Sequence, residues 1–349
     1  MQIIHVVRLY CPQGGMERYV WELTHQMRDL GHEVIVLCQA CQIEKPLGIK
    51  VYELGLMSKR PRWLSYLRFN KKIVSWLHKN PHPNAVIHSH ERLSCHHITT
   101  FHGPPFANVL QKPWWKLISA RIWIQLYLEQ RELNVAHFII PNSIIIKELL
   151  TGYYPELAHK LTLPVIPGVA NLKHNEFCAI PDGSGVIGFV GREWKRKGLH
   201  LAVSVVENLR ITRPNLEFQV IGPEINEIQH LFTNWVAGYK LIGWSDKQHY
   251  SDFDVLFHPA KSEPYGMVIS EAMAAGLPVV ISDACGAAAQ VTHKSGSILP
   301  LTATIQDWSN ALEAQLKRTE PVPPFVRSWN EAAQECLKIY SDYFESKKP

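Results

Sequence analysis

Residues 255–283 decide the fold, and they read VLFHPAKSEPYGMVISEAMAAGLPVVISD. The first four residues form a short apolar run that is typical of a buried strand, and the loop after them is rich in turn formers. Gly266 then opens a segment whose apolar residues recur at helical spacing, and Gly276 and Pro278 end it before a second apolar run. The stretch therefore predicts a strand, a loop, a helix and a strand of one parallel sheet. Because ligands of such sheets bind at the carboxyl ends of the strands, the loop is a candidate ligand site.

Similar alternation of short apolar runs and amphipathic segments covers most of the chain. Because 349 residues are too many for one ordinary core, the pattern predicts two doubly wound α/β domains, at residues 1–166 and 186–324. An apolar run at 161–167 is interpreted as a strand at the end of the first domain. Residues 167–185 lose the periodicity and predict a linker. After a Pro-rich break, residues 325–349 predict a last amphipathic helix that starts at the beginning of this segment.

The composition is that of a globular protein, with 46% hydrophobic and 19% charged residues. The net charge of +5 is too small an excess to indicate a nucleic-acid partner. The chain starts without a signal-peptide pattern and contains no apolar run of about 18 residues, the length that spans a bilayer. We therefore expect a cytoplasmic protein, and we interpret its seven scattered cysteines as reduced thiols.

The first apolar run, at 2–10, is followed by a loop that contains Gly14 and Gly15 and then by an amphipathic segment at 16–30. This order of strand, glycine loop and helix is the setting of a Rossmann phosphate loop, although the GxGxxG spacing is missing. Two interpretations stay open at this point. The glycines form a tight turn that needs a positive φ, or they bring the backbone close to a ligand.

Two segments, residues 57–82 and 112–131, combine basic with aromatic residues. Basic helices rich in Trp suit an anionic membrane surface or an anionic amphiphilic substrate. The alternative is a pair of ordinary helices whose aromatic faces pack on the core and whose basic faces are solvated.

Five histidines lie between residues 88 and 102. His88 and His90 share one face of a predicted strand, because side chains two apart in a strand point the same way. No carboxylate or cysteine set follows at the spacing of metal ligands, so no metal site is predicted. His102 stands at the carboxyl end of the next predicted strand, where a polar contact to a substrate is the better interpretation.

Charged residues follow two predicted strands of the second domain. Arg192 and Lys197 lie in the loop after the strand at 186–190, five residues apart around a turn, where they could converge on a diphosphate. Glu263 lies in the loop of the opening stretch, and Glu271 lies in its helix. Ionised carboxylates accept several O–H bonds and therefore suit hydroxyl-rich ligands. Cations and carboxylates at one sheet edge indicate a site for a nucleoside diphosphate joined to a sugar, and the alternative for the cations is a solvated turn.

These motifs resemble those of retaining glycosyltransferases of family four, which have the GT-B fold: two Rossmann-like domains that face each other across a cleft. Glu263 and Glu271 match the E-x7-E signature of that family. Four further elements fall in the family's order and spacing: Gly14-Gly15, Gly191-Arg192, Lys197-Gly198 and the segment 276–280. The resemblance covers essentially the whole chain. Within the family, the short 86–102 region, the basic aromatic segments and the compact length are similar to those of lipopolysaccharide core glucosyltransferases.

The resemblance implies a role for each matched residue. Arg192 and Lys197 would bind the diphosphate leaving group, Glu263 would hold the donor sugar, and Glu271 would hold the nucleotide ribose. His102 would contact the transferred sugar. The lipopolysaccharide glucosyltransferases tend to carry an acidic residue near the position of His102, so the identity of the sugar stays open. The remaining implied donor-site residues are Tyr265, the amides of Gly266, Met267 and Val268, the loop glycines Gly14 and Gly15, and, near the base, Gly222, Glu224, Ile242 and Gly243.

The implied reaction is the transfer of a hexose, with retention, from a UDP-sugar such as UDP-glucose to an anionic glycan or glycolipid such as the lipopolysaccharide core. Fixed cations would stabilise the leaving diphosphate, so neither a metal nor a cofactor is expected. The enzyme would be peripheral on the cytoplasmic face of the inner membrane, and its last helix would cross back to the first domain. The alternatives are a GDP-mannose or ADP-heptose donor, a sugar-nucleotide epimerase of the same fold, and a non-catalytic protein that binds nucleotide sugars.

Overall fold

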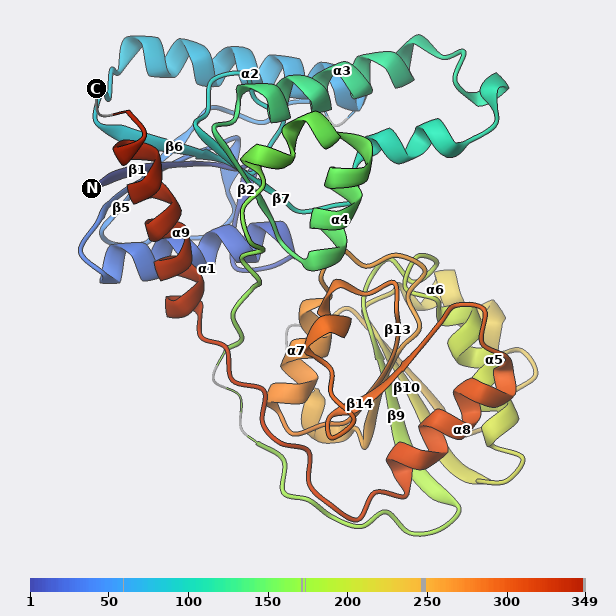
Figure 1. Cartoon of the computed structure of the whole chain (residues 1–349). Coiled ribbons are helices and arrows are strands. Elements are labelled where there is room, and N and C mark those ends of the chain that lie inside the picture. The colour runs from blue at the N-terminus through green and yellow to red at the C-terminus, as the bar shows by residue number, and fades with distance from the viewer. Residues whose placement is uncertain (59, 171, 173, 246–248, 348–349) are drawn as a thin grey trace. The chain divides into compact units, whose positions relative to one another are not determined.

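The computed structural model describes all residues except 59, 171, 173, 246–248 and 348–349, and the chain divides into two compact units (Figure 1). The first unit contains Met1–Gly168 and Ser328–Pro349, and the second contains Val169–Arg327. Each unit is built on one parallel sheet of six strands with helices on both faces, which confirms the predicted α/β class. None of the helices in the described parts of the chain is long and apolar enough to cross a membrane.

The sheet of the first unit has the strand order β5-β3-β1-β6-β7-β8. Its strands are β1 (Gln2–Val6), β3 (Glu33–Cys38), β5 (Ile49–Glu53), β6 (Ala85–Ser89), β7 (Ile98–Phe101) and β8 (Phe138–Pro141). The short strands β2 (Leu9–Tyr10) and β4 (Ala40–Cys41) pair separately, so the single strand predicted at 2–10 is two strands. Its α-helices are α1 (Met16–Asp29), α2 (Arg62–Lys79), α3 (Ala120–Val135), α4 (Ile144–Tyr153) and α9 (Trp329–Glu345). Helices α1 and α9 cover one face of the sheet, and α2 and α3 cover the other (Figure 1).

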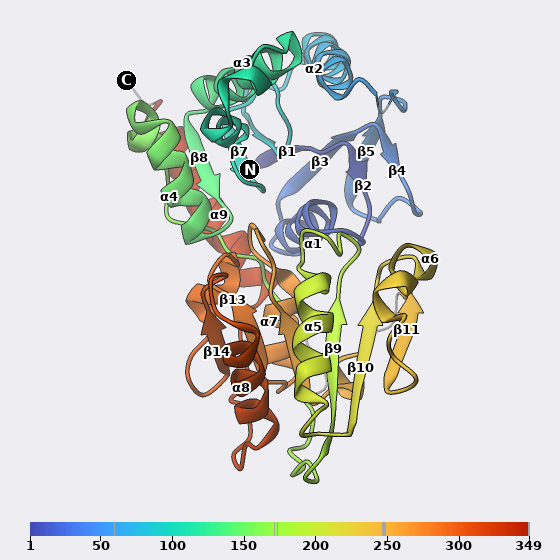
Figure 2. The same ribbon diagram turned by 90° about the vertical axis from the view of Figure 1, so that its right-hand side faces the viewer.

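The sheet of the second unit has the strand order β11-β10-β9-β12-β13-β14. Its strands are β9 (Ser184–Val190), β10 (Asn215–Ile221), β11 (Tyr239–Gly243), β12 (Val255–His258), β13 (Val279–Ser282) and β14 (Gly296–Leu299). Its α-helices are α5 (Leu199–Leu209), α6 (Ile225–Ile228), α7 (Met267–Ala274) and α8 (Ile305–Leu316). Figure 2 shows α5 and α8 side by side on one face of this sheet, and α7 lies on the other.

Buried apolar side chains fill the space between sheet and helices in each unit. In the second unit, Phe257 of β12 packs on the fully buried Trp308 of α8, with their ring centroids 5.6 Å apart. In the first unit, Ile4 of β1 and Phe69 of α2 belong to one buried cluster. Burial of this kind is the main term that holds each sheet against its helices.

The prediction from residues 255–283 is confirmed, because β12, α7 and β13 follow one another and the two strands are parallel neighbours in the sheet. Pairing joins Leu256 to Val279 and His258 to Ile281. The loop between β12 and α7 therefore leaves the sheet at its carboxyl edge, as the sequence predicts.

The strand predicted at 161–167 is wrong. Within this described segment, Leu161 makes an isolated bridge to Ile139 of β8, and no ladder follows. The physical reason is that Pro164 and Pro167 have no backbone N–H to donate to a ladder. The apolar residues run along the edge of β8 without forming a strand beside it.

The start predicted for the last helix is also wrong. The pattern predicts a helix from Phe325, but α9 begins at Trp329. The hydroxyl of Ser328 accepts a hydrogen bond from the backbone N–H of Glu331, whose carboxylate accepts one from the N–H of Ser328. This capping box sets the first turn, and residues 325–327 before it are not helical.

Candidate active site

Loops of the second unit meet where its strand order reverses. Strand β9 lies between β10 and β12, so the chain leaving β9 and the chain leaving β12 turn to opposite sides of this point. Such a switch point is the usual ligand crevice of a doubly wound sheet. The two loops pack closely here, because a Cβ added to Gly198, at a φ of 82°, would lie 2.0 Å from the carbonyl oxygen of Pro259.

Glu263 is the centre of this region, and its carboxylate contacts three other polar side chains. The ammonium nitrogen of Lys197 lies 3.2 Å from Glu263 Oε2, and a guanidinium nitrogen of Arg196 lies 3.3 Å from the same oxygen. The imidazole Nε2 of His258 is 3.4 Å away. Glu263 is only 8% exposed, so these contacts are made in a largely water-free environment. The predicted convergence of a cation and a carboxylate from two loops is therefore present for Lys197 and Glu263.

The protonation states at this centre follow from burial and charge. Burial alone would raise the pKa of Glu263, but Lys197, His258 and Arg196 act against it and hold the pKa well below its usual range. Burial and the nearby Lys197 lower the pKa of His258 to about 4. Glu263 is therefore an anion between two cations, and His258 is a neutral donor to it.

Arg192 does not take part in this network. Its guanidinium lies over the indole ring of Trp244, 3.7 Å from the ring centroid, and the residue is exposed. Arg196, which no sequence pattern indicates, lies beside Glu263 instead and also bonds to Glu193. All three cations belong to one loop, but the structure brings only Lys197 and Arg196 to the carboxylate.

Glu271, the second carboxylate of the E-x7-E pair, is buried in α7 with 8% of its surface exposed. Its Oε2 accepts a hydrogen bond from the hydroxyl of Tyr250, a contact that no sequence pattern predicts. A buried carboxylate with a fixed orientation suits a ligand hydroxyl, and the ribose role of Glu271 stays a prediction.

The start of α7 combines a left-handed glycine with helical amides. Gly266 has a φ of 94°, and a Cβ there would lie 2.9 Å from Ile269, so a larger residue is strained at this position. Met267 and Val268 open the helix, and the first amides of a helix have no intrahelical acceptor. The side chain of Tyr265 is buried and its hydroxyl bonds to that of Ser270, 2.8 Å away, and its donor-site role stays a prediction.

The residues predicted near the base lie in the loop after β10 and at the end of β11. The N–H of Gly222 donates to the carbonyl oxygen of Gly243 over 2.7 Å, and a Cβ on Gly222 would lie 2.8 Å from the backbone of Gly191. Glu224 is exposed beside them, at the start of α6, and Ile242 is partly exposed at the end of β11. Gly222 is therefore needed for its close approach to Gly191, and Gly243 has a φ of 74° that favours glycine, whatever ligand binds there.

The other predicted site residues belong to the first unit. Gly14 has a φ of 95°, as the tight-turn interpretation expects, whereas Gly15 has a φ of −89°. Gly15 precedes α1, and a Cβ on it would meet nothing within 4 Å. His102 follows β7, and its Nε2 lies 2.9 Å from Nδ1 of His90. The ligand roles of these three residues stay predictions.

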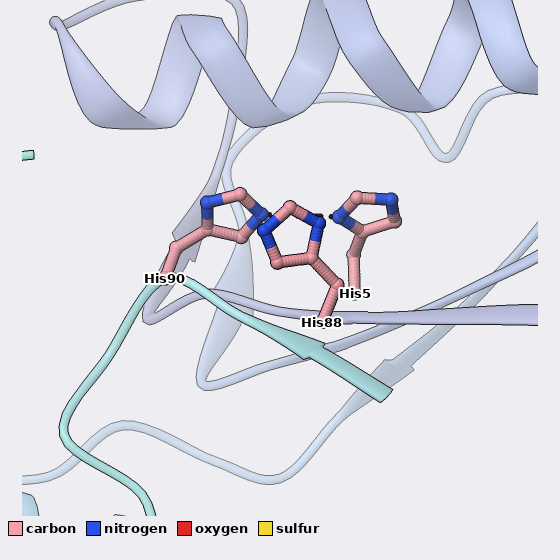
Figure 3. Close-up of side chains that lie close together, drawn as sticks. All are labelled: His5, His88 and His90. Atoms are coloured by element: carbon pink, nitrogen blue, oxygen red, sulfur yellow. Dashed lines mark hydrogen bonds between the residues drawn. The ribbon is translucent and has the colours of Figure 1, made fainter. Parts of the chain in front are cut away.

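His5 of β1, His88 of β6 and His90, which follows β6, come together and are buried (Figure 3). In the described part of the chain they are the group whose ligand atoms lie close enough, within 4.8 Å, to be considered for a metal. Their nitrogens are nevertheless already paired. His5 bonds to His90, and His88 bonds to the hydroxyls of Thr100 and Tyr340. The geometry is therefore that of a hydrogen-bonded cluster.

The buried histidines of the first unit predict that the chain loses stability in mild acid. Burial lowers the pKa of His5 to about 3 and that of His96 to about 4, whereas an unfolded histidine titrates near 6.5. Between these values the unfolded chain binds more protons than the folded one, so stability is complete above about pH 6.5 and falls as the pH drops towards 4. In this window, each such histidine lowers the free energy of unfolding by about 1.4 kcal/mol for each pH unit of acidification. We expect the Tm to fall steeply between pH 7 and pH 5.

A matched pair of variants checks the cause. His96→Gln should flatten the loss of Tm, whereas His78→Gln, at an exposed position of α2, should leave the slope as it is. A Tm that stays constant from pH 8 to pH 5 in the unaltered chain would contradict this account.

Two family models match the chain. Residues 173–335 match the family model described as glycosyl transferases group 1, and residues 13–167 match the model described as glycosyltransferase family 4. A GDP-mannose-dependent alpha-mannosyltransferase of Mycolicibacterium smegmatis is 32% identical over 314 residues, which cover 82% of this chain and 80% of that protein. A D-inositol 3-phosphate glycosyltransferase of Corynebacterium urealyticum is 23% identical, with coverage of 94% and 90%.

Solved structures show the same fold. WaaG, a glycosyltransferase involved in lipopolysaccharide biosynthesis, superimposes with a TM-score of 0.78 at 17% identity, covering 99% of this chain and 98% of WaaG. Anabaena HepE in complex with UDP-glucose gives a TM-score of 0.67 at 17% identity, with 99% of both chains covered. Together with the matches in sequence, these likenesses confirm the GT-B fold predicted for two Rossmann-like domains. The chain belongs to glycosyltransferase family 4, and it is a retaining hexosyltransferase that uses a nucleotide-sugar donor.

Proposed function

We propose that the chain transfers a hexose from a UDP-sugar to an anionic, membrane-associated glycan or glycolipid such as a lipopolysaccharide core. The observation that carries the proposal is the buried Glu263 held between Lys197 and Arg196 at the switch point of the second unit. A nucleoside diphosphate joined to a sugar offers both anionic oxygens for the cations and hydroxyl groups for the carboxylate.

The charge arrangement supports front-face transfer. An acceptor hydroxyl attacks the anomeric carbon, the bond from that carbon to the phosphate oxygen breaks, and the leaving diphosphate takes the proton of the acceptor. Lys197 and Arg196 are placed to stabilise the negative charge that grows on the leaving group, so the reaction is proposed to need no metal. Glu263 is a weak nucleophile, because the same two cations hold its pKa low. This argues against a glycosyl-enzyme intermediate on Glu263.

A GDP-mannose donor is the second candidate. It is favoured by the relative of 32% identity, whose name describes a GDP-mannose-dependent alpha-mannosyltransferase. The UDP-hexose is favoured by the resemblance to lipopolysaccharide core glucosyltransferases and by the fold shared with the HepE structure that holds UDP-glucose. Both donors present the same diphosphate to Lys197 and Arg196, so the base and sugar decide between them.

The acceptor side of the proposal rests on an exposed apolar surface of the first unit. We call it the aromatic patch, and its side chains are between 46% (Leu110) and 72% (Trp114) exposed. They lie in η1 (Phe106–Gln111), in η2 (Trp114–Lys116) and between η2 and the middle of α3. The members of the patch are Leu110, Trp114, Trp115, Ile118, Trp123 and Tyr127. Exposed Trp and Ile side chains beside basic residues are typical of proteins that lie on a membrane surface.

Helix α2 follows the plainer interpretation of its basic aromatic sequence. Its Tyr66 and Phe69 are buried, so its aromatic face packs on the core. Its basic face borders a pocket of about 470 Å³ that includes Arg68, Lys71 and Lys72. This pocket is a candidate site for an anionic group of the acceptor.

Removing two indoles from the aromatic patch is expected to release the chain from membranes. The double variant Trp114→Ser, Trp115→Ser loses two of the largest exposed apolar side chains, so we expect binding to phosphatidylglycerol vesicles to fall at least roughly tenfold. Co-sedimentation measures it. Leu163→Ser, at an exposed apolar residue outside the patch, is the control and should bind as the unaltered chain does. Equal binding of all three proteins would refute a membrane role for the patch.

Transfer itself is tested with radiolabelled donors. The full chain is incubated with membranes that contain lipopolysaccharide core acceptors, and with UDP-glucose, GDP-mannose or an ADP-heptose. Label in the lipid from UDP-glucose supports the proposal, and label from GDP-mannose moves the function to the second candidate. Free epimer, or unchanged donor in every reaction, would contradict the transferase proposal.

A further inference from the structure

Three histidines of the first unit form a hydrogen-bonded chain that ends on a methionine. Nε2 of His102 lies 2.9 Å from Nδ1 of His90, and Nε2 of His90 lies 3.0 Å from Nδ1 of His5. Nε2 of His5 lies 3.3 Å from the sulfur of Met27, on α1. We call His5, His90 and His102 the histidine chain. The link between His5 and His90 is drawn in Figure 3.

Each imidazole of the histidine chain is neutral. His5 and His90 are 0% and 5% exposed, and an imidazolium is strongly disfavoured in such surroundings. Burial lowers the pKa of His5 and of His102 to about 3 and lowers that of His90 well below its ordinary value. A neutral imidazole has one N–H, which donates, and one bare nitrogen, which accepts. A chain of neutral imidazoles therefore has a direction.

Met27 decides that direction. Its side chain is fully buried, and a thioether has no hydrogen to donate and is a weak acceptor. A bare Nε2 on His5 would place two acceptors against each other at 3.3 Å, so the proton of His5 lies on Nε2. Nδ1 of His5 is then bare and accepts from Nε2–H of His90.

The same argument fixes the direction of the hydrogen bonds at the His102 end of the histidine chain. Because His90 donates through Nε2, its Nδ1 is bare and accepts from Nε2–H of His102. Nδ1 of His102 is then bare as well. Among the residues that the structure describes, no hydrogen-bond partner is found for this atom. His88 does not compete, since its nitrogens bond to the hydroxyls of Thr100 and Tyr340.

We propose that Met27, acting through His5 and His90, holds His102 in the tautomer with its proton on Nε2, so that Nδ1 of His102 accepts a hydrogen bond from a sugar hydroxyl of the substrate. That the ligand is a sugar rests on the proposed function. Met27, His5 and His90 are positioning residues in this scheme. They select a ligand group that donates a hydrogen, such as a hydroxyl, and they disfavour a carboxylate or phosphate oxygen at this point.

Nitrogen NMR of the ligand-free chain tests the tautomer directly. In a protein labelled with ¹⁵N at histidine, long-range ¹H–¹⁵N correlations distinguish a protonated from a bare ring nitrogen, and single His→Gln variants assign the signals. At neutral pH we expect His102 with the proton on Nε2 by roughly ten to one or more, the preference that a mispaired buried group imposes. A proton on Nδ1 of His102 would overturn the proposal.

A second variant tests the part played by Met27. Met27→Leu removes the sulfur acceptor at nearly constant volume, so the direction of the histidine chain is no longer set, and we expect both tautomers of His102 in the spectrum. Met273→Leu, at a buried methionine of the second unit, is the matched control and should leave the His102 signals unchanged. An unchanged tautomer ratio in Met27→Leu would refute the role of Met27.

The outcome does not depend on the donor. The spectra are recorded without ligand, so a chain that fails to transfer a hexose can still show the expected tautomer, which would leave the inference standing and remove only the proposed function. An active transferase with the proton on Nδ1 of His102 would instead remove the inference and leave the proposed function standing.

Discussion

Glu263→Gln is expected to lower kcat/KM for hexose transfer by about 10²- to 10³-fold, which is the usual effect of removing one preorganised electrostatic group from an active site. The amide is close in size to the carboxylate but carries no charge. It cannot hold Lys197 and Arg196, which lie 3.2 Å and 3.3 Å from Glu263 Oε2, and it accepts hydroxyl hydrogens less strongly. Initial rates with the donor identified in the transfer assay measure the effect.

Glu193→Gln is the matched control. Glu193 also pairs with Arg196, but 68% of its side chain is exposed, and exposed ion pairs contribute little. We expect near-normal rates for it. Glu263→Asp keeps the charge with a shorter reach and should retain part of the activity, which separates loss of charge from misfolding. Normal turnover by a folded Glu263→Gln protein would remove Glu263 from the catalytic assignment.

Lys197→Gln is expected to lower kcat by about 10²-fold or more. Lys197 stands in the loop after β9, and its ammonium group is the cation closest to Glu263 at the switch point. The negative charge on the leaving diphosphate is greatest in the transition state, so loss of a fixed cation acts mainly on kcat. Loss of Lys197 also raises the pKa of Glu263, because this lysine is one of the groups that lower it.

Lys195→Gln is the control for charge alone. Lys195 belongs to the same loop, but it is exposed and its ammonium lies over the ring of Trp194, 4.9 Å from the centroid. We expect its kcat to stay within about twofold of normal, as for most surface substitutions. If Lys197→Gln and Lys195→Gln had the same kcat, the position of the lysine within the loop would not matter, and Lys197 could not be assigned to the leaving diphosphate.

The sequence predicts the strand–loop–helix–strand around Glu263 well, because the signals for it are local. An apolar run, turn residues, helical spacing and a terminating glycine each act within a few residues. The neighbourhood of Lys197 and Glu263 is also predictable, since the carboxyl ends of parallel strands share one edge. Which cation of the loop reaches Glu263 is not predictable, because it depends on the turn conformation. In the structure Arg196 contacts Glu263, and Arg192 lies on Trp244.

Features that depend on strand register were missed for a different reason. His5 is 83 residues from His88 in sequence, and the two meet because β1 and β6 pair with His5 opposite His88. Periodicity within a strand says nothing about its partner or its register. Helix α8 was also missed, although a signal for it exists in Thr304 and Asp307, which form a capping box at its start.

The central claim is that the second unit carries a nucleotide-sugar site, and thermal melting with nucleotides tests it most directly. The full chain is melted with UDP, GDP, ADP or CDP in the presence of EDTA, beside the Glu271→Gln variant. A ligand that binds the folded state raises Tm by mass action. We expect one nucleotide, UDP first and GDP second, to raise Tm in the unaltered chain and to raise it less in Glu271→Gln, where the ribose contact is weakened. A Tm that no nucleotide changes would contradict the claim that the second unit carries a nucleotide-sugar site.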